Sequence, residues 1–121
     1  MPSSNAPADP PRSYRVFDLK ALAAGREFVP WREGVEICRL YGDEKVERAA
    51  AMLRYAPNAE VPLHEHNGFE HIFVLEGAQE DASGVYGAGS MVVNPPGSRH
   101  QVRSPGGCTV LILWDGPVTL V

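Results

Sequence analysis

Four side chains in the second half of the chain are of types that hold metal ions in proteins. His64 and His66 lie two residues apart, so their rings project from the same face of an extended strand. Glu70 has the same parity and joins that face if the strand continues past the break at Asn67-Gly68. His100 follows a Gly/Pro-rich turn further along the chain. We call His64, His66, Glu70 and His100 the His/Glu cluster and expect it to bind one divalent metal ion.

Three imidazoles and one carboxylate suit a divalent transition metal. The set fits Zn, Fe, Mn, Ni or Cu, with Zn and Fe favoured as the cofactor. Ca and Mg prefer sites built from oxygen ligands alone and are not expected here. An isolated His-x-His pair is often no more than two exposed polar side chains. The expectation therefore depends on the carboxylate and the third imidazole that accompany the pair.

Short apolar runs separated by Gly, Pro, Asn and Asp indicate the strands that must position the cluster. The runs cover residues 35–41, 46–55, 70–75, 83–86, 90–94, 100–103, 109–114 and 118–121. Many short strands with turn signals about every ten residues predict an all-β fold. We expect a single antiparallel domain that is a β-sandwich or a barrel.

Two segments carry helical signals. Residues 19–24 lie between Asp18, which could cap a short helical turn, and Gly25, which could end it. Residues 44–54 contain Glu, Lys, Arg and three consecutive alanines, which favour a helix by propensity. The neighbours of this second segment are strand-like and two prolines follow it closely, so we expect a strand there.

Length and charge limit the possible functions. With 121 residues the chain fits one domain, and a net charge of −4 without a basic stripe argues against nucleic acid as a partner. The longest apolar run is far short of a membrane span, so no membrane insertion is expected. Residues 1–12 are rich in Pro, Ser and Ala and are predicted to be a disordered tail without a secretory signal, followed by one domain over 13–121. A cytoplasmic location is then expected, with Cys38 and Cys108 as free thiols.

Two motifs around the His/Glu cluster resemble those of the cupin superfamily. The first motif is matched by His64, His66, Glu70 and Gly77, and the second by Gly89, Pro95, Gly97 and His100. The leading Gly of the first motif is replaced by Asn58 or Ala59, and the Asn that often follows the last His is Ser104. The resemblance implies a single-domain antiparallel β-sandwich of the jelly-roll barrel type that holds one metal ion inside on the His/Glu cluster.

Further phrases of the sequence resemble the ChrR-like group of cupins. They lie at residues 34–42, 53–57, 70–77 and 86–90, and the likeness covers the chain from about Ser13 onward. This group includes the C-terminal domain of a zinc-containing anti-sigma factor and dioxygenases that act on small molecules such as diketones. In the anti-sigma proteins a separate N-terminal domain with its own His/Cys zinc site inhibits the sigma factor. Nothing like that domain exists here, so the chain is not expected to be an anti-sigma factor by itself.

Two functions remain open from the sequence. In the first, octahedral Fe or Mn keeps a position free for a small-molecule substrate, water or O₂, and the protein is a dioxygenase-like enzyme. In the second, the same ligands close a tetrahedral zinc site that stabilises the barrel or senses a ligand. No separate catalytic acid or base can be assigned. Tyr41, Arg54, Tyr55 and Trp114 are candidates for lining the cavity, although aromatic residues of β-proteins more often belong to the core.

Strand parity separates an outer from an inner face in the segment around Glu70. The outer set is Phe69, His71, Phe73 and Leu75, and the inner set is Glu70, Ile72 and Val74. His71 is therefore expected to lie outside the metal site. The apolar outer side chains need cover, either from the N-terminal segment or from a second subunit. We expect a homodimer.

Overall fold

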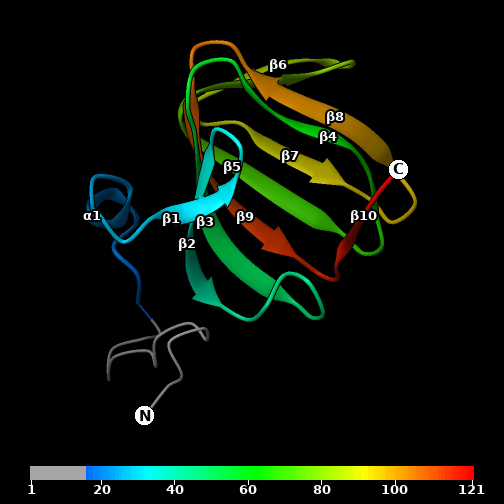
Figure 1. The fold of residues 1–121 in the computed structure, drawn as a ribbon, viewed down its shortest axis with the longest axis horizontal. Coiled ribbons are helices and arrows are strands. Elements are labelled where there is room, and N and C mark those ends of the chain that lie inside the picture. The colour runs from blue at the N-terminus through cyan, green and yellow to red at the C-terminus, as the bar shows by residue number, and fades with distance from the viewer. Residues whose placement is uncertain (1–15) are drawn as a thin grey trace.

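The structure is a computed structural model that describes residues 16–121, which form one short helix and a curled antiparallel sheet (Figure 1). The elements are α1 (Leu19–Ala23), β1 (Val29–Arg32), β2 (Val35–Tyr41), β3 (Ala49–Tyr55), β4 (Ala59–His66), β5 (Glu70–Asp81), β6 (Gly84–Gly87), β7 (Met91–Asn94), β8 (Arg99–Ser104), β9 (Cys108–Trp114) and β10 (Val118–Leu120). The all-β prediction is confirmed. Among the described residues no helix is long and apolar enough to cross a membrane. The predicted tail lies outside the described residues, so the domain boundary at residue 13 stays a prediction.

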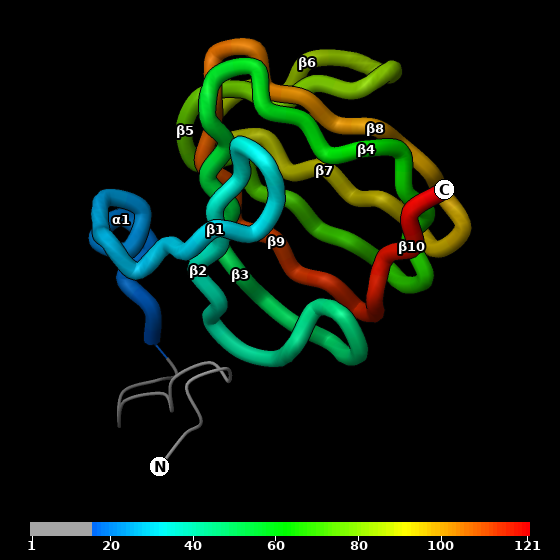
Figure 2. Tube along the Cα trace, in the orientation of Figure 1, coloured from blue at the N-terminus to red at the C-terminus, as the bar shows by residue number. Residues whose placement is uncertain are grey.

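The long strand β5 joins the two halves of the sheet. The strands follow the order β1-β2-β3-β9-β5-β8-β4-β10, and β6 and β7 also pair with β5 (Figure 2). The first part of β5 pairs with β9 and β7, while its end pairs with β6 and touches β8 at Glu80 and Arg103. Trp31 of β1 and Val118 of β10 pack on the same core, although these strands stand at opposite ends of the order. The sheet therefore curls around one interior.

The apolar core fills the inside of the curl. Alternate residues of each strand point inward, as expected for strands with one face on the core. The buried members include Val35, Ile37, Leu53, Tyr55, Ile72, Val74, Val102, Val110, Ile112 and Trp114. Ser104, where the second motif often has Asn, is fully buried and donates a hydrogen bond of 2.6 Å to the carbonyl of Ala78.

Helix α1 covers part of the outer face of the sheet. The predicted cap is present, because the Asp18 side chain accepts a 3.0 Å hydrogen bond from the N–H of Ala21. Apolar residues of α1 pack on a second cluster that includes Cys38, Met52 and Leu75. The N-terminal segment thus supplies the cover for Leu75. Both cysteines are free and buried, as expected.

The segment over residues 44–54 forms a strand despite its helical propensity, but the strand begins later than expected. Residues 43–48 form a turn in which Asp43 accepts hydrogen bonds from the N–H groups of Lys45, Val46 and Glu47. Strand β3 starts only at Ala49. Its first five residues are all buried, because the core lies on one face and neighbours of α1 lie on the other. Burial on both faces explains why small alanines are needed there.

Candidate metal centre

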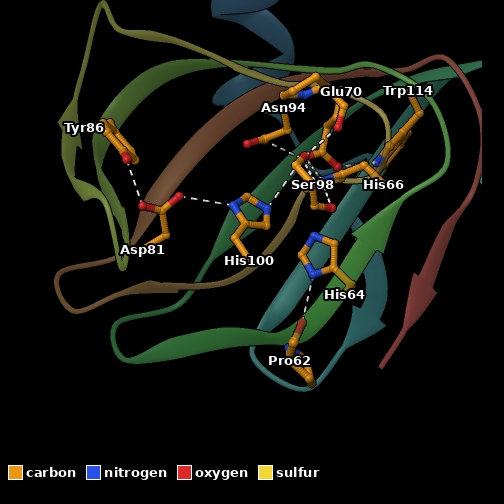
Figure 3. Close-up of polar contacts among 11 residues, drawn as sticks. Pro62, His64, His66, Glu70, Asp81, Tyr86, Asn94, Ser98, His100 and Trp114 are labelled. Atoms are coloured by element: carbon orange, nitrogen blue, oxygen red, sulfur yellow. Dashed lines mark hydrogen bonds and ion pairs between the residues drawn. The ribbon is translucent and has the colours of Figure 1, made fainter.

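The His/Glu cluster converges in the interior of the curl from three strands (Figure 3). His64 and His66 point inward from β4, and His100 of β8 stands directly opposite His64 in the β4–β8 pairing. Glu70 is the first residue of β5. All four side chains are buried, with His66 only 1% exposed and Glu70 3% exposed.

The strand that carries His64 and His66 does not continue to Glu70, which differs from one expectation drawn from the sequence. The strand that carries the two histidines ends at His66, and Glu70 begins a different strand, β5. The shared parity of His66 and Glu70 therefore does not place them on one continuous strand. In the sheet, β8 lies between β4 and β5. The two residues therefore meet across the interior of the curl.

The distances within the cluster suit one small cation. The three imidazole centroids are separated by 4.9, 4.6 and 4.7 Å, and the donor atoms of the four residues lie within 4.8 Å of one another. The Oε1 atom of Glu70 lies 3.1 Å from Nε2 of His66 and 3.7 Å from Nε2 of His100. No other group of this kind is found among residues 16–121.

Each imidazole is held by an oxygen acceptor at its Nδ1 atom. His64 Nδ1 lies 2.8 Å from the carbonyl oxygen of Pro62, and His100 Nδ1 lies 3.1 Å from Oδ2 of Asp81. His66 Nδ1 faces the carbonyl oxygen and the hydroxyl of Ser98 at 3.0 and 2.9 Å. Since the Ser98 hydroxyl donates its proton to the carbonyl of Pro95, it accepts from His66. All three rings are therefore assigned a proton on Nδ1, which leaves Nε2 as the atom that can bind a metal.

This tautomer aims three nitrogen lone pairs at the centre of the cluster. The Nε2 atoms of His66 and His100 are buried and have no hydrogen-bond partner. The short approach of His66 Nε2 to Glu70 Oε1 therefore needs a proton or a cation between the two atoms. Buried polar atoms without a partner are costly, and a shared metal ion would relieve the cost. The donor set thus fits a transition metal.

The Glu70 carboxylate is held in its charged form. Oε2 accepts a 3.0 Å hydrogen bond from the indole N–H of Trp114, and Oε1 accepts one of 3.1 Å from the Asn94 amide. Burial by itself would raise the pKa of Glu70, but its contacts with the imidazoles, His66 first, hold the pKa below its ordinary value. Burial also lowers the pKa of His64, against a smaller opposing effect of its bond to the Pro62 carbonyl. Both shifts favour the protonation states that bind metal.

Asp81 orients His100 from the end of β5. One carboxylate oxygen of Asp81 faces His100, and the other accepts hydrogen bonds from the Tyr86 hydroxyl at 2.7 Å and from the N–H of Ser83 at 2.8 Å. Burial acts to raise the pKa of Asp81, but these hydrogen bonds lower it overall. The β5–β6 hairpin therefore places a fixed negative charge behind one imidazole of the cluster.

A glycine with a left-handed backbone lets Ser98 reach His66. Gly97 has a φ of 85°, a conformation that residues with a Cβ atom rarely adopt. Two backbone hydrogen bonds join this turn to His66. The N–H of Gly97 donates to the His66 carbonyl, and the N–H of His66 donates to the Ser98 carbonyl. The Pro-x-Gly part of the second motif thus holds His66 as well as leading into His100.

Other residues singled out from the sequence lie outside the cluster. The His71 ring points to the outer face, as parity predicts, and stacks on Phe69 with ring centroids 6.1 Å apart. Tyr41 is exposed, whereas Tyr55 and Trp114 are buried in the core. Arg54 lies over the ring of Phe28 and pairs with Glu36.

Sequence reasoning did not find four residues that hold the cluster in place. Asn94, Ser98 and Asp81 had no assigned role, and Trp114 was considered only as a wall of the cavity. Asn94 and Trp114 both pair with Glu70 in register, one from β7 and one from β9. Side chains opposite each other share a face of the sheet, so a correct strand order would have indicated both.

The curled sheet and the inward-facing His/Glu cluster define a cupin. Residues 20–119 match the family of ChrR Cupin-like domains, and the chain belongs to this family. No curated protein matches the chain in sequence.

Many solved structures are similar to the chain, among them the following three. A cupin-like protein of unknown function from Ralstonia eutropha JMP134 is 27% identical, with a TM-score of 0.63 over 69% of this chain and 56% of that one. The anti-sigma ChrR in complex with SigE from Rhodobacter sphaeroides is 26% identical, with a TM-score of 0.67 over 76% of this chain and 50% of that one. An acetylacetone dioxygenase from Acinetobacter johnsonii is 17% identical, with a TM-score of 0.73 over all of this chain and 85% of that one. The chain thus spans about half the length of the first two, and the third shows the fold alone.

Proposed function

We propose that the His/Glu cluster binds one divalent transition metal, with zinc or iron favoured, and that the protein binds and oxidises a small molecule there. The observation that carries this proposal is the set of buried Nε2 lone pairs and the ionised carboxylate that face one another. When bound, an iron ion would supply redox chemistry with O₂. The protein's part is to keep Glu70 charged and to hold the three rings by their Nδ1 atoms.

A second function is supported by where the ligands lie. The four residues come from β4, β5 and β8, so a closed zinc site would join separate strands of the curled sheet. Such a site stabilises a fold or couples it to a ligand without catalysis. The likeness to the anti-sigma ChrR, whose complex with SigE has been solved, favours this non-enzymatic function.

Metal content and O₂ uptake distinguish the two functions. Protein purified without added metal should contain about one iron per chain, and the iron form should consume O₂ when acetylacetone is added. The same protein reloaded with zinc is the matched control and should consume none, because zinc has no redox chemistry. One zinc per chain as isolated, together with no O₂ uptake by the iron form, would support the second function instead.

We also propose that the protein forms a homodimer in the cytoplasm. The outer face of β5 and β7 carries Phe69, Phe73, Met91 and Val93, of which Met91 is 56% exposed and Val93 42% exposed. Strand β7 pairs only with β5 among the described strands, so it offers a free edge next to these apolar side chains. A reducing compartment agrees with the two buried free thiols.

The dimer can be tested by placing a charge on this outer face. Light scattering should find a dimer for the wild type and a monomer for Val93→Lys, because a buried lysine without a partner is strongly disfavoured at an interface. Val85→Lys is the matched control, since Val85 is exposed on β6, away from β7, and this variant should remain a dimer. A wild type that is monomeric at high concentration would contradict the proposal.

A further inference from the structure

Arg32 is a half-buried cation that points toward the interior of the curl. It is the last residue of β1 and stands opposite Val35, whose side chain is 1% exposed in the core. Side chains opposite each other on paired strands share a face of the sheet. The Nε atom of Arg32 is buried without a hydrogen-bond partner, and no ion pair among residues 16–121 includes this residue. The fold therefore holds a half-buried positive charge that no ion pair of the described residues neutralises.

Two indole rings lie between Arg32 and the His/Glu cluster, and the first belongs to a bulge in β1. The pairing of β1 with β2 shifts between Pro30 and Arg32, which leaves Trp31 as an extra residue. The Arg32 guanidinium lies 4.7 Å from the centroid of the Trp31 ring, and this ring lies 6.2 Å from that of Trp114. Trp114 in turn donates its N–H to Glu70.

Arg32 lines both a small cavity and a larger one. The inner one has a volume of about 100 Å³ and is lined by Trp31, Arg32, Glu44, Lys45, Trp114 and Val118. A larger and more open one, of about 720 Å³, is lined by the β1–β2 hairpin turn around Gly34 and by the turn around Asn58 that joins β3 to β4, and it also includes Arg32. The guanidinium thus stands between an open cavity and a small one whose wall includes the tryptophan that holds Glu70.

The acidic residues near Arg32 do not neutralise it. Both carboxylate oxygens of Glu44 are taken up by Arg39, at 2.9 and 2.8 Å, and one of them also accepts the indole N–H of Trp31. Glu33 and Glu60 are exposed at the rim of the larger cavity and form no ion pair with Arg32. The inner cavity therefore has an uncompensated positive charge and would attract an anion.

We propose that Arg32 binds the carboxylate of a small organic acid, and that the molecule recognised beside the metal centre belongs to this chemical class. A guanidinium forms two parallel hydrogen bonds with a carboxylate, and the two indole rings offer an apolar wall for the rest of a small ligand. The cavity beside Trp114 has room for only a few non-hydrogen atoms, which favours a compact acid. The position next to the metal depends on the proposed function, but the binding of a carboxylate by Arg32 does not.

Two probes of similar size separate charge from shape. Acetoacetate and acetylacetone share a 1,3-dicarbonyl skeleton, but only acetoacetate has a carboxylate. Titration calorimetry on the metal-loaded protein should find tighter binding of acetoacetate. Binding should also quench tryptophan fluorescence, because the two tryptophans of the chain, Trp31 and Trp114, both line the inner cavity.

Variants of Arg32 give the decisive comparison. Arg32→Gln should lose about tenfold or more of its affinity for acetoacetate and keep that for acetylacetone, because a charged hydrogen bond is removed. Arg32→Lys keeps the charge without the planar fork and should lose less, and it carries the test if the Gln variant does not fold. Arg26→Gln removes the same charge from an exposed loop and should bind both probes like the wild type.

Unchanged acetoacetate affinity in the Arg32 variants, or no acetoacetate binding by the wild type, would overturn the proposal. The outcome is independent of catalysis, because the same titrations can be made with the zinc-loaded and the metal-free protein. Acetoacetate binding that depends on Arg32 in a protein that consumes no O₂ would leave the anion site standing and contradict the oxidation proposed above.

Discussion

Replacing His66 or His100 with alanine should abolish stoichiometric metal binding, whereas His71→Ala should leave it intact. Each of the first two changes removes one of four donors, and the remaining three come from a site whose geometry depends on all of them. Loss of a residue that only orients a ligand costs roughly 10–100-fold in metal affinity, so loss of a ligand itself should cost more. The measurement is metal content after dialysis, together with titration of the metal-free protein.

His71→Ala is a strict control for this experiment. It removes the same ring one residue from Glu70, but that ring stacks on Phe69 at the outer face and faces no member of the cluster. A metal-free His71→Ala variant beside a metal-loaded His66→Ala variant would show that the wrong face of β5 had been assigned to the site.

A chelator should lower the melting temperature strongly at pH 7.5 and much less near pH 5. A metal that binds only the folded state at about 100 times its dissociation constant adds roughly 2.7 kcal/mol to the free energy of unfolding. For a domain of this size that corresponds to a shift of about 10 °C. Below the ordinary histidine pKa of about 6.5, protons compete for the imidazoles, so less metal is bound before the chelator is added.

The two pKa shifts at the site also act on the metal-free protein, and in the same direction. Because the pKa of His64 is lowered by burial, the unfolded chain takes up a proton below about pH 6.5 that the folded chain does not, and stability falls as the pH drops. The lowered pKa of Glu70 stabilises the fold above about pH 4.3, and this contribution is lost as the pH falls through its folded value. Thermal melts with and without chelator at both pH values check these signs. An equal chelator effect at pH 7.5 and pH 5 would refute the site.

The sequence indicated which residue types form the candidate site because their spacing is local. His64 and His66 share a face on any extended strand, and the motif glycines mark turns, so these features do not depend on the strand order. Glu70 was placed on the face of His64 and His66 on the condition that their strand continues past the Asn67-Gly68 break, but Glu70 begins a new strand. The family pattern includes Glu70 without that condition, and its role as a ligand stays a prediction.

The contacts that could not be predicted from the sequence depend on pairings between distant strands. Asp81 reaches His100 only because the end of β5 crosses to β8. Trp114 reaches Glu70 because β9 runs beside β5 over most of its length. The late start of β3 has a different cause, since the Asp43 turn competes locally with the strand. Strand order and local turn hydrogen bonds are both hidden from the periodicity of apolar residues.

The register of β4 against β8, which places His64 directly opposite His100, has a consequence for the time course of folding. Those two strands are separated in the chain by all of β5, β6 and β7, so we expect the ligands to assemble late, after much of the non-local pairing. A metal captured that late stabilises the native state and leaves the folding barrier nearly unchanged. Metal should therefore lower the unfolding rate and hardly change the folding rate. The His/Glu cluster would then stabilise the folded sheet without nucleating its formation.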